Sequence, residues 1–68
     1  MKVKVDNDIF PNIIRNQEYD IIRTEEIGDD LFYIVVGEDG KEEGIIDMVA
    51  IVINDIIKFN KKIKMEMN

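Results

Sequence analysis

The chain contains no cysteine, histidine, serine or tryptophan, and Thr24 is its only threonine. Without cysteine there is no disulfide and no thiolate zinc site, which are the usual supports of very small domains. Without serine, cysteine and histidine, neither a Ser-His-Asp nor a Cys-His catalytic arrangement can form within this chain. Carboxylates are numerous, but 68 residues leave little volume for a cleft that would separate two carboxyl pKa values. We therefore predict that the protein is not an enzyme and that it holds no cofactor or metal.

Long hydrophobic runs are also missing. No apolar stretch approaches the roughly 18 residues that cross a bilayer, and residues 1–5 alternate Lys with Val instead of opening a signal peptide. A chain this short buries only about 60% of its unfolded surface, so a single compact core is the upper limit. The sequence thus predicts one cytoplasmic domain that does not contact a membrane.

The apolar residues that are present favour β-strands. The chain has 14 Ile and 6 Val, against one Leu and one Ala. Side chains branched at Cβ lose rotamer freedom in helices and pack well on a pleated sheet. This bias predicts a mostly β fold.

Strand signals follow one another along the first half of the chain. Residues 1–5 show the period-2 pattern of a half-buried strand. After a loop that contains Pro11, residues 19–27 predict a second strand, which ends at the turn-forming residues 28–30. Residues 31–36 are apolar at every position, which predicts a central strand buried on both faces.

The segment after Gly44 fits two structures. Just before it, residues 38–41 (Glu-Asp-Gly-Lys) carry the Asp-Gly pair that supplies positive φ in a tight hairpin. Read as strand, residues 45–53 are interrupted by a short break at Asp47. Read as helix, Asp47 is an N-cap and apolar residues recur at helical spacing over residues 47–64. We favour the strand because four of the five residues at 49–53 are branched at Cβ.

The order of these elements over residues 1–53 resembles that of small SH3-like barrel proteins of bacteriophages and mobile elements. Glu18-Tyr19-Asp20-Ile21-Ile22, Phe32-Tyr33-Ile34-Val35-Val36 and Glu38-Asp39-Gly40-Lys41 carry the resemblance. It implies a five-stranded, partly open β-barrel. We assign residues 1–57 to this single domain and residues 58–68 to a short basic C-terminal tail. The alternative is an α+β fold, a three-stranded antiparallel sheet with one C-terminal helix. At residues 63–67, apolar Ile and Met alternate with Lys and Glu, and this pattern also fits a final strand.

The resemblance implies no particular activity, because this fold hosts unrelated functions. Polyproline recognition is not expected, since it uses an aromatic groove that includes tryptophan, and the chain has none.

Charge is distributed unevenly along the chain. Residues 1–57 carry 14 acids and 5 bases, a net charge of −9, whereas residues 58–68 carry a net charge of +3. Many of the acids cluster at the two predicted hairpin tips, and if these tips lie close together, eight carboxylates share one surface. This candidate interaction surface consists of Glu25, Glu26, Asp29, Asp30, Glu38, Asp39, Glu42 and Glu43.

Two functions agree with these features. The first is a non-catalytic protein-interaction module, derived from a phage or mobile element, that binds a protein partner or a second copy of itself. Its contacts are expected at the sheet edges and on the apolar side of the tail. The alternative is an acidic inhibitor that imitates nucleic acid in the basic groove of a DNA- or RNA-binding enzyme; an accessory subunit of a larger catalytic complex is a third reading. Direct binding to nucleic acid is disfavoured by charge repulsion.

Overall fold

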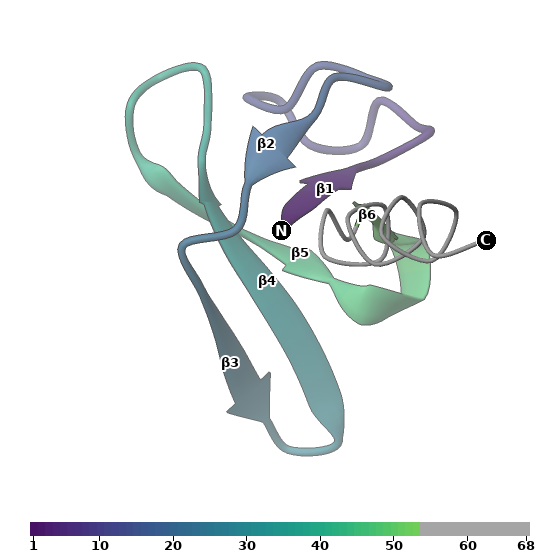
Figure 1. Cartoon of the computed structure of the whole chain (residues 1–68), viewed down its shortest axis with the longest axis vertical. Coiled ribbons are helices and arrows are strands. Elements are labelled where there is room, and N and C mark those ends of the chain that lie inside the picture. The colour runs from purple at the N-terminus through teal and green to yellow at the C-terminus, as the bar shows by residue number, and fades with distance from the viewer. Residues whose placement is uncertain (54–68) are drawn as a thin grey trace, which may run out of the picture.

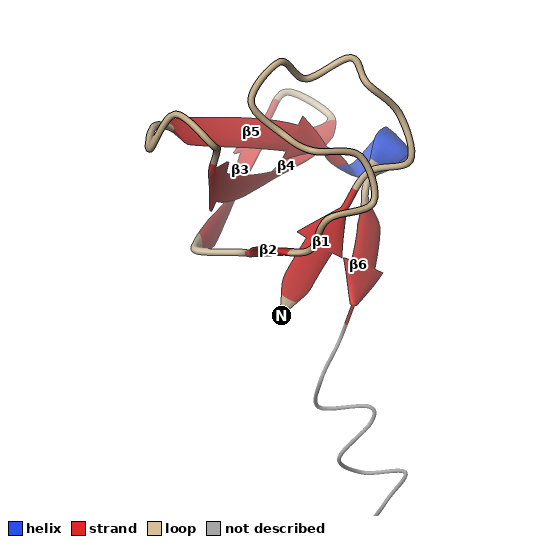
Figure 2. Cartoon of the chain, turned by 90° about the horizontal axis from the view of Figure 1, so that it is seen from above, coloured by secondary structure: helices blue, strands red, loops and turns tan. Residues whose placement is uncertain are grey.

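The protein is mostly β, as the sequence predicts. A computed structural model describes residues 1–53, which form two three-stranded antiparallel sheets (Figures 1 and 2). The first sheet has the strand order β2-β1-β6 and the second has the order β3-β4-β5. The strands are β1 (Lys2–Lys4), β2 (Tyr19–Asp20), β3 (Arg23–Ile27), β4 (Asp30–Val36), β5 (Glu42–Ile46) and β6 (Ile51–Ile53), and a 3-10 helix, η1 (Asp47–Val49), joins β5 to β6.

The first sheet is centred on β1, whose alternation of Lys and Val has the predicted effect. Val3 pairs with Tyr19 of β2 on one side and with Val52 of β6 on the other. Val3 and Val5 are completely buried, while Lys2 on the opposite face is partly exposed. The period-2 pattern therefore places one face of this sheet on the core.

The second sheet is a meander with two tight connections. Ile27 pairs with Asp30, so Gly28 and Asp29 form a two-residue turn. Gly28 has a φ of 64°, and a glycine with positive φ at the first turn position is the requirement of a type II′ hairpin.

Five residues connect β4 to β5, and Gly37 and Lys41 close a three-residue loop at 38–40. The Gly40 amide donates to the carbonyl of Gly37 at 3.0 Å, and the Gly37 amide donates to the carbonyl of Lys41 at 2.8 Å. Gly40 has a φ of 80°, which completes the common pattern of a turn followed by one left-handed residue. The Asp-Gly signal thus predicts both the hairpin and its left-handed residue.

The single strand predicted over residues 19–27 is wrong, because it is divided into β2 and β3 at Ile21 and Ile22. The Ile22 amide donates to the carbonyl of Ile34 at 2.8 Å, while Arg23 is the register partner of the same residue. Two residues on one strand therefore face one residue of β4, which is the pattern of a β-bulge. A bulge bends its strand, and here the chain passes from the first sheet to the second at this point.

The strand interpretation of residues 45–53 is confirmed, and the helical one is wrong for the part of it that the structure describes. The Ala50 amide donates to the carbonyl of Asp47 at 3.1 Å, which closes a single 3-10 turn. Ile46 and Ala50 on either side are extended, so the turn does not continue as an α-helix. The rest of the predicted helix, the strand at 63–67, the domain end at residue 57 and the tail at 58–68 lie outside the described residues.

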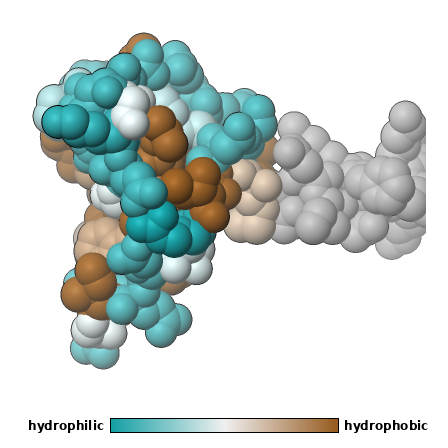
Figure 3. All heavy atoms as spheres, turned by 90° about the vertical axis from the view of Figure 1, so that its left-hand side faces the viewer, coloured by the Kyte–Doolittle hydropathy of each residue, from teal (hydrophilic) through white to brown (hydrophobic). Residues whose placement is uncertain are grey.

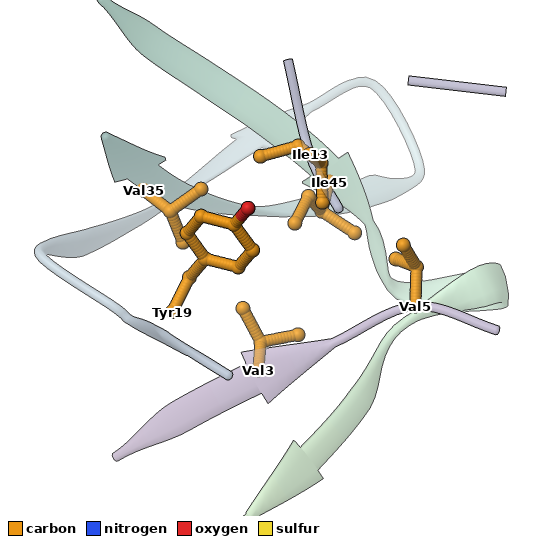
Figure 4. Packing of buried hydrophobic residues seen from close by; sticks show 6 residues of the cluster. All are labelled: Val3, Val5, Ile13, Tyr19, Val35 and Ile45. Carbon is orange, nitrogen blue, oxygen red and sulfur yellow. The ribbon is translucent and has the colours of Figure 1, made fainter. Parts of the chain in front are cut away.

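The core lies between the two sheets and the long loop at residues 6–18. Figure 4 shows its buried side chains pointing toward one another from the sheets and the loop. Both fully buried residues of the second sheet, Val35 and Ile45, belong to it. The buried cluster consists of Val3, Val5, Ile13, Tyr19, Val35 and Ile45.

Burial of residues 31–36 on both faces holds only at Ile34 and Val35, near the end of β4. Val35 is fully buried in the core, and Ile34 is 7% exposed on the opposite face of the strand. Residues 31–33 are partly buried, and Val36 is 47% exposed. The prediction is wrong for these four residues; Val36 is exposed because the outer face of this sheet has no second layer among the described residues.

Candidate interaction surface

The eight predicted acidic residues do not gather at one end of the second sheet. The turn at Gly28 and the loop at residues 38–40 lie at opposite ends of β4 (Figure 1). Glu25, Glu26, Asp29 and Asp30 therefore lie near one end of the second sheet, and Glu38, Asp39, Glu42 and Glu43 lie near the other. The sequence could not decide this, because a hairpin signal fixes a turn but not which end of the sheet carries the next one.

Arg23 joins one acid from each group. Its guanidinium lies 2.8 Å from Oε2 of Glu25 and 2.6 Å from Oε1 of Glu42. Hydrogen bonds from Arg23 hold the pKa of the Glu42 carboxyl below its usual value, and both carboxylates raise the pKa of Arg23. Because these ion pairs are exposed, we expect them to orient side chains rather than to stabilise the fold strongly.

The acids of the β4–β5 loop are tied to the long loop. The Tyr19 hydroxyl donates to Oε2 of Glu38 at 2.9 Å, and the Glu38 amide donates to the carbonyl of Asn12 at 2.7 Å. The Asn12 side-chain amide also donates to Oδ2 of Asp39 at 3.2 Å. Gly37 allows this close approach, because a Cβ there would lie 3.0 Å from the Asn12 carbonyl oxygen and the long loop would have to shift.

The long loop is held in place by its own contacts as well. Its residue Ile13 is buried in the core, and the Asn16 amide donates to the carbonyl of Val5 at 2.8 Å. Arg15 contacts Asp6 at 2.9 Å, and this hydrogen bond lowers the pKa of the Asp6 carboxyl. The loop therefore positions the residues that precede β2.

The outer face of the second sheet carries an apolar patch that the sequence analysis missed. Cross-strand partners share a face, so Phe32 and Ile46 lie together, and Ile34 lies with Arg23 and Gly44. The absence of a Cβ at Gly44 leaves space that the Ile34 and Phe32 side chains border. We call this set the outer patch, and it consists of Ile22, Ile27, Phe32, Ile34, Val36 and Ile46.

Three members of the outer patch are well exposed: Ile22 at 48%, Ile27 at 63% and Val36 at 47%. On the side of the molecule in Figure 3, hydrophobic residues gather at mid-height between hydrophilic residues above and below. The sequence did contain a signal for this patch, because side chains alternate along a strand and residues 32, 34 and 36 therefore share one face of β4. These residues become exposed when only the other face of the strand is covered.

An acidic groove adjoins the outer patch where β2 meets the end of β4. Ile22 and Val36 form its apolar part, and Glu18, Asp20 and Glu38 supply carboxylates. Its volume is about 390 Å³, and the complete lining is Gln17, Glu18, Tyr19, Asp20, Ile22, Val36 and Glu38. Within the described part of the chain, no Lys or Arg forms an ion pair with Glu18 or Glu38.

Two other features are absent from the same residues. Among residues 1–53, no three acidic side chains are arranged to hold a metal ion. No helix in this described range has the length and apolar character needed to cross a membrane. Comparisons with protein-family models, with curated proteins and with solved structures gave no match to the chain.

Proposed function

We propose that the chain is a non-catalytic protein-interaction module that binds its partner on the outer patch and the adjoining acidic groove. The observation that carries the proposal is the exposure of Ile22 and Val36, which lie together in the groove and are each about half exposed. Contiguous apolar side chains rimmed by polar groups are typical of protein-binding surfaces. The register places Val36 on the same face of the second sheet as Phe32 and Ile46, and the exposed Ile27 lies at the other end of that face.

Charge indicates the chemistry of the partner. Glu18, Asp20 and Glu38 line the groove next to the outer patch. Arg23 lies on the same face as the patch and is already paired with Glu25 and Glu42. A protein segment that carries both apolar and basic side chains complements such a surface, because opposite charges steer encounter and fix orientation. We therefore infer a basic, amphipathic protein partner.

The fold supports a module of the SH3-like kind, and we propose this architecture as well. If β2 and β3 are counted as one strand bent at Ile22, the two sheets give the order β6-β1-β2/β3-β4-β5. A 3-10 turn then links the last two strands along the chain. We propose that this order is that of the five-stranded, partly open barrel which the resemblance to phage and mobile-element proteins implies.

Imitation of nucleic acid is the less favoured function. Its strongest support is the tip of the β3–β4 hairpin, which carries Glu26, Asp29 and Asp30. This tip extends past Phe32, the last residue of β4 that pairs with β5. The two acidic groups nevertheless lie at opposite ends of β4, and Arg23 neutralises part of each. No continuous row of carboxylates results.

A comparative capture experiment tests the proposal. Wild-type chain, the variant Val36→Glu and the control Met48→Glu are immobilised and exposed to the same lysate. Val36 lies in the outer patch, whereas Met48 is 85% exposed on η1. We expect one partner to be retained by wild type and M48E and lost by V36E. Equal retention by both variants would contradict the proposal, and release of the partner by added DNA or RNA would support nucleic-acid mimicry instead.

A further inference from the structure

Residues 54–68 carry the opposite charge from the rest of the chain. Residues 1–53 have a net charge of −8 and residues 54–68 a net charge of +2, which together give the −6 of the whole chain. The same segment is rich in apolar side chains, which alternate with its lysines. These residues are Ile56, Ile57, Lys58, Phe59, Lys61, Lys62, Ile63, Lys64, Met65 and Met67.

The segment begins close to the acidic groove. Lys2 of β1 pairs with Ile53 on one side and with Asp20 on the other, so these three residues form one row across the first sheet. Neighbouring strands lie about 4.8 Å apart, which places Ile53 about 10 Å from Asp20. Asp20 lines the groove. Because an extended residue covers about 3.3 Å, roughly three residues after Ile53 are enough to reach it.

The groove and the segment are complementary in chemistry. Ile22 and Val36 expose about half of their surface in the groove and offer an apolar contact. Asp20 already has a cation nearby, since Lys2 lies 3.9 Å away. Glu18 and Glu38 have no Lys or Arg in ion-pair contact among the described residues. A segment in which Ile and Phe alternate with Lys matches both properties.

We propose that residues 54–68 bind in the acidic groove of the same chain. Tethering supports an intramolecular contact, because a short connection gives a local concentration on the order of millimolar. The bound segment covers Ile22 and Val36, so it competes with a protein partner for the outer patch. The inference thus adds regulation to the proposed function; the competition rests on that function, whereas the intramolecular contact does not.

Paramagnetic NMR on the full chain tests the contact. The chain has no cysteine, so Asn68→Cys provides a single site for a nitroxide label. We expect the label to broaden the amide signals of Ile22, Val36 and Glu38 and to leave Gly28, at the other end of β4, unchanged. The broadening should disappear at about 1 M salt, where the Debye length falls to about 3 Å.

Two charge reversals serve as a matched pair in the labelled chain. Glu18→Lys removes a groove carboxylate, and Glu26→Lys makes the same change of charge near the far hairpin. We expect E18K to reduce the broadening severalfold and E26K to preserve it. Equal effects of the two variants, or no broadening at the groove, would overturn the inference.

A mixed sample distinguishes a contact within one chain from a contact between two chains. It contains isotope-labelled chain without nitroxide and nitroxide-labelled chain of natural isotope content. Broadening in this mixture would assign the segment to a second copy and overturn the intramolecular contact. A failure of the proposed function would be detected by a different result, equal capture of the partner by the V36E and M48E variants. That result does not depend on whether residues 54–68 bind in the groove.

Discussion

The hydroxyl group of Tyr19 donates a hydrogen bond to Oε2 of Glu38 at 2.9 Å, and it accepts one from the Ile14 amide at 2.8 Å. One buried side chain thereby connects β2 and the adjoining long loop with the β4–β5 loop, whose Glu38 lies 19 residues further along the chain. The ring contributes to the core while its hydroxyl organises the edge of the acidic groove.

Replacing Tyr19 by Phe should lower the free energy of unfolding by about 1–2 kcal/mol, because two hydrogen bonds are lost and the ring is retained. Urea denaturation measures the change. The variant should also shift the amide resonances of Ile14 and Glu38 more than those of the distant turn at Gly28. Unchanged stability together with unchanged Ile14 and Glu38 resonances would show that the hydroxyl does not organise this edge.

Alkaline pH should weaken the fold through the two tyrosines. Burial raises the pKa of Tyr19 above its usual value of 10.0, and the nearby Glu38 carboxylate adds to the effect. For Tyr33, the hydrogen bond to Asp47 is the main cause of a raised pKa, followed by burial. A raised folded pKa gives stability that is complete below pH 10 and is lost as pH rises through the folded value.

Urea denaturation at a series of alkaline pH values measures this loss, and tyrosinate absorbance follows the ionisation. The variants Tyr19→Phe and Tyr33→Phe should each flatten the pH dependence in part. If the double variant loses stability over the same alkaline range as wild type, ionisation of other groups is responsible.

Core truncation should separate the two faces of the second sheet. Ile45 is fully buried, so Ile45→Ala should cost about 2–4 kcal/mol. Val36 is 47% exposed on the outer face, and Val36→Ala should cost less than about 0.5 kcal/mol. Chemical denaturation of both variants provides the comparison, and similar costs would contradict the assignment of inner and outer faces.

Two glycines should respond differently to an added methyl group. At Gly37 a Cβ would meet the Asn12 carbonyl oxygen at 3.0 Å, so Gly37→Ala should cost about 1–3 kcal/mol. At Gly44 the closest atom is a side-chain carbon of Ile34 at 3.5 Å, an ordinary contact. Gly44→Ala should therefore be neutral or stabilise by up to about 1 kcal/mol, because alanine reduces the entropy of the unfolded chain. Denaturation midpoints that reverse this order would contradict the close approach of Asn12 to Gly37.

The sequence predicted the features that depend on local chemistry. Alternation at residues 1–5 identified the inward valines, and Gly28 and Gly40 marked the two turns because both need positive φ. The break within residues 19–27 could not be predicted, since the bulge depends on the pairing of Ile22 and Arg23 with a distant residue, Ile34.

The candidate surface was predicted less well than the fold. The acidic residues were identified from their charge, but their division between two ends of β4 follows from the meander and not from composition. The exposure of Val36 could not be predicted, because a continuous apolar run is compatible with a strand covered on one face or on both faces. Only the number of layers over the sheet distinguishes these cases.

The pairing of Lys2 with both Asp20 and Ile53 has a consequence for the order in which the protein folds. The β3-β4-β5 meander forms through short loops, whereas β6 pairs with β1 across almost the entire described chain. Contacts between residues distant in sequence carry a larger loop-closure entropy and form more slowly. During synthesis, β1 leaves the ribosome before the other described strands and has to wait for residues 51–53 before its second edge is covered. The strand that is made before its neighbours is thus among the last to be completed.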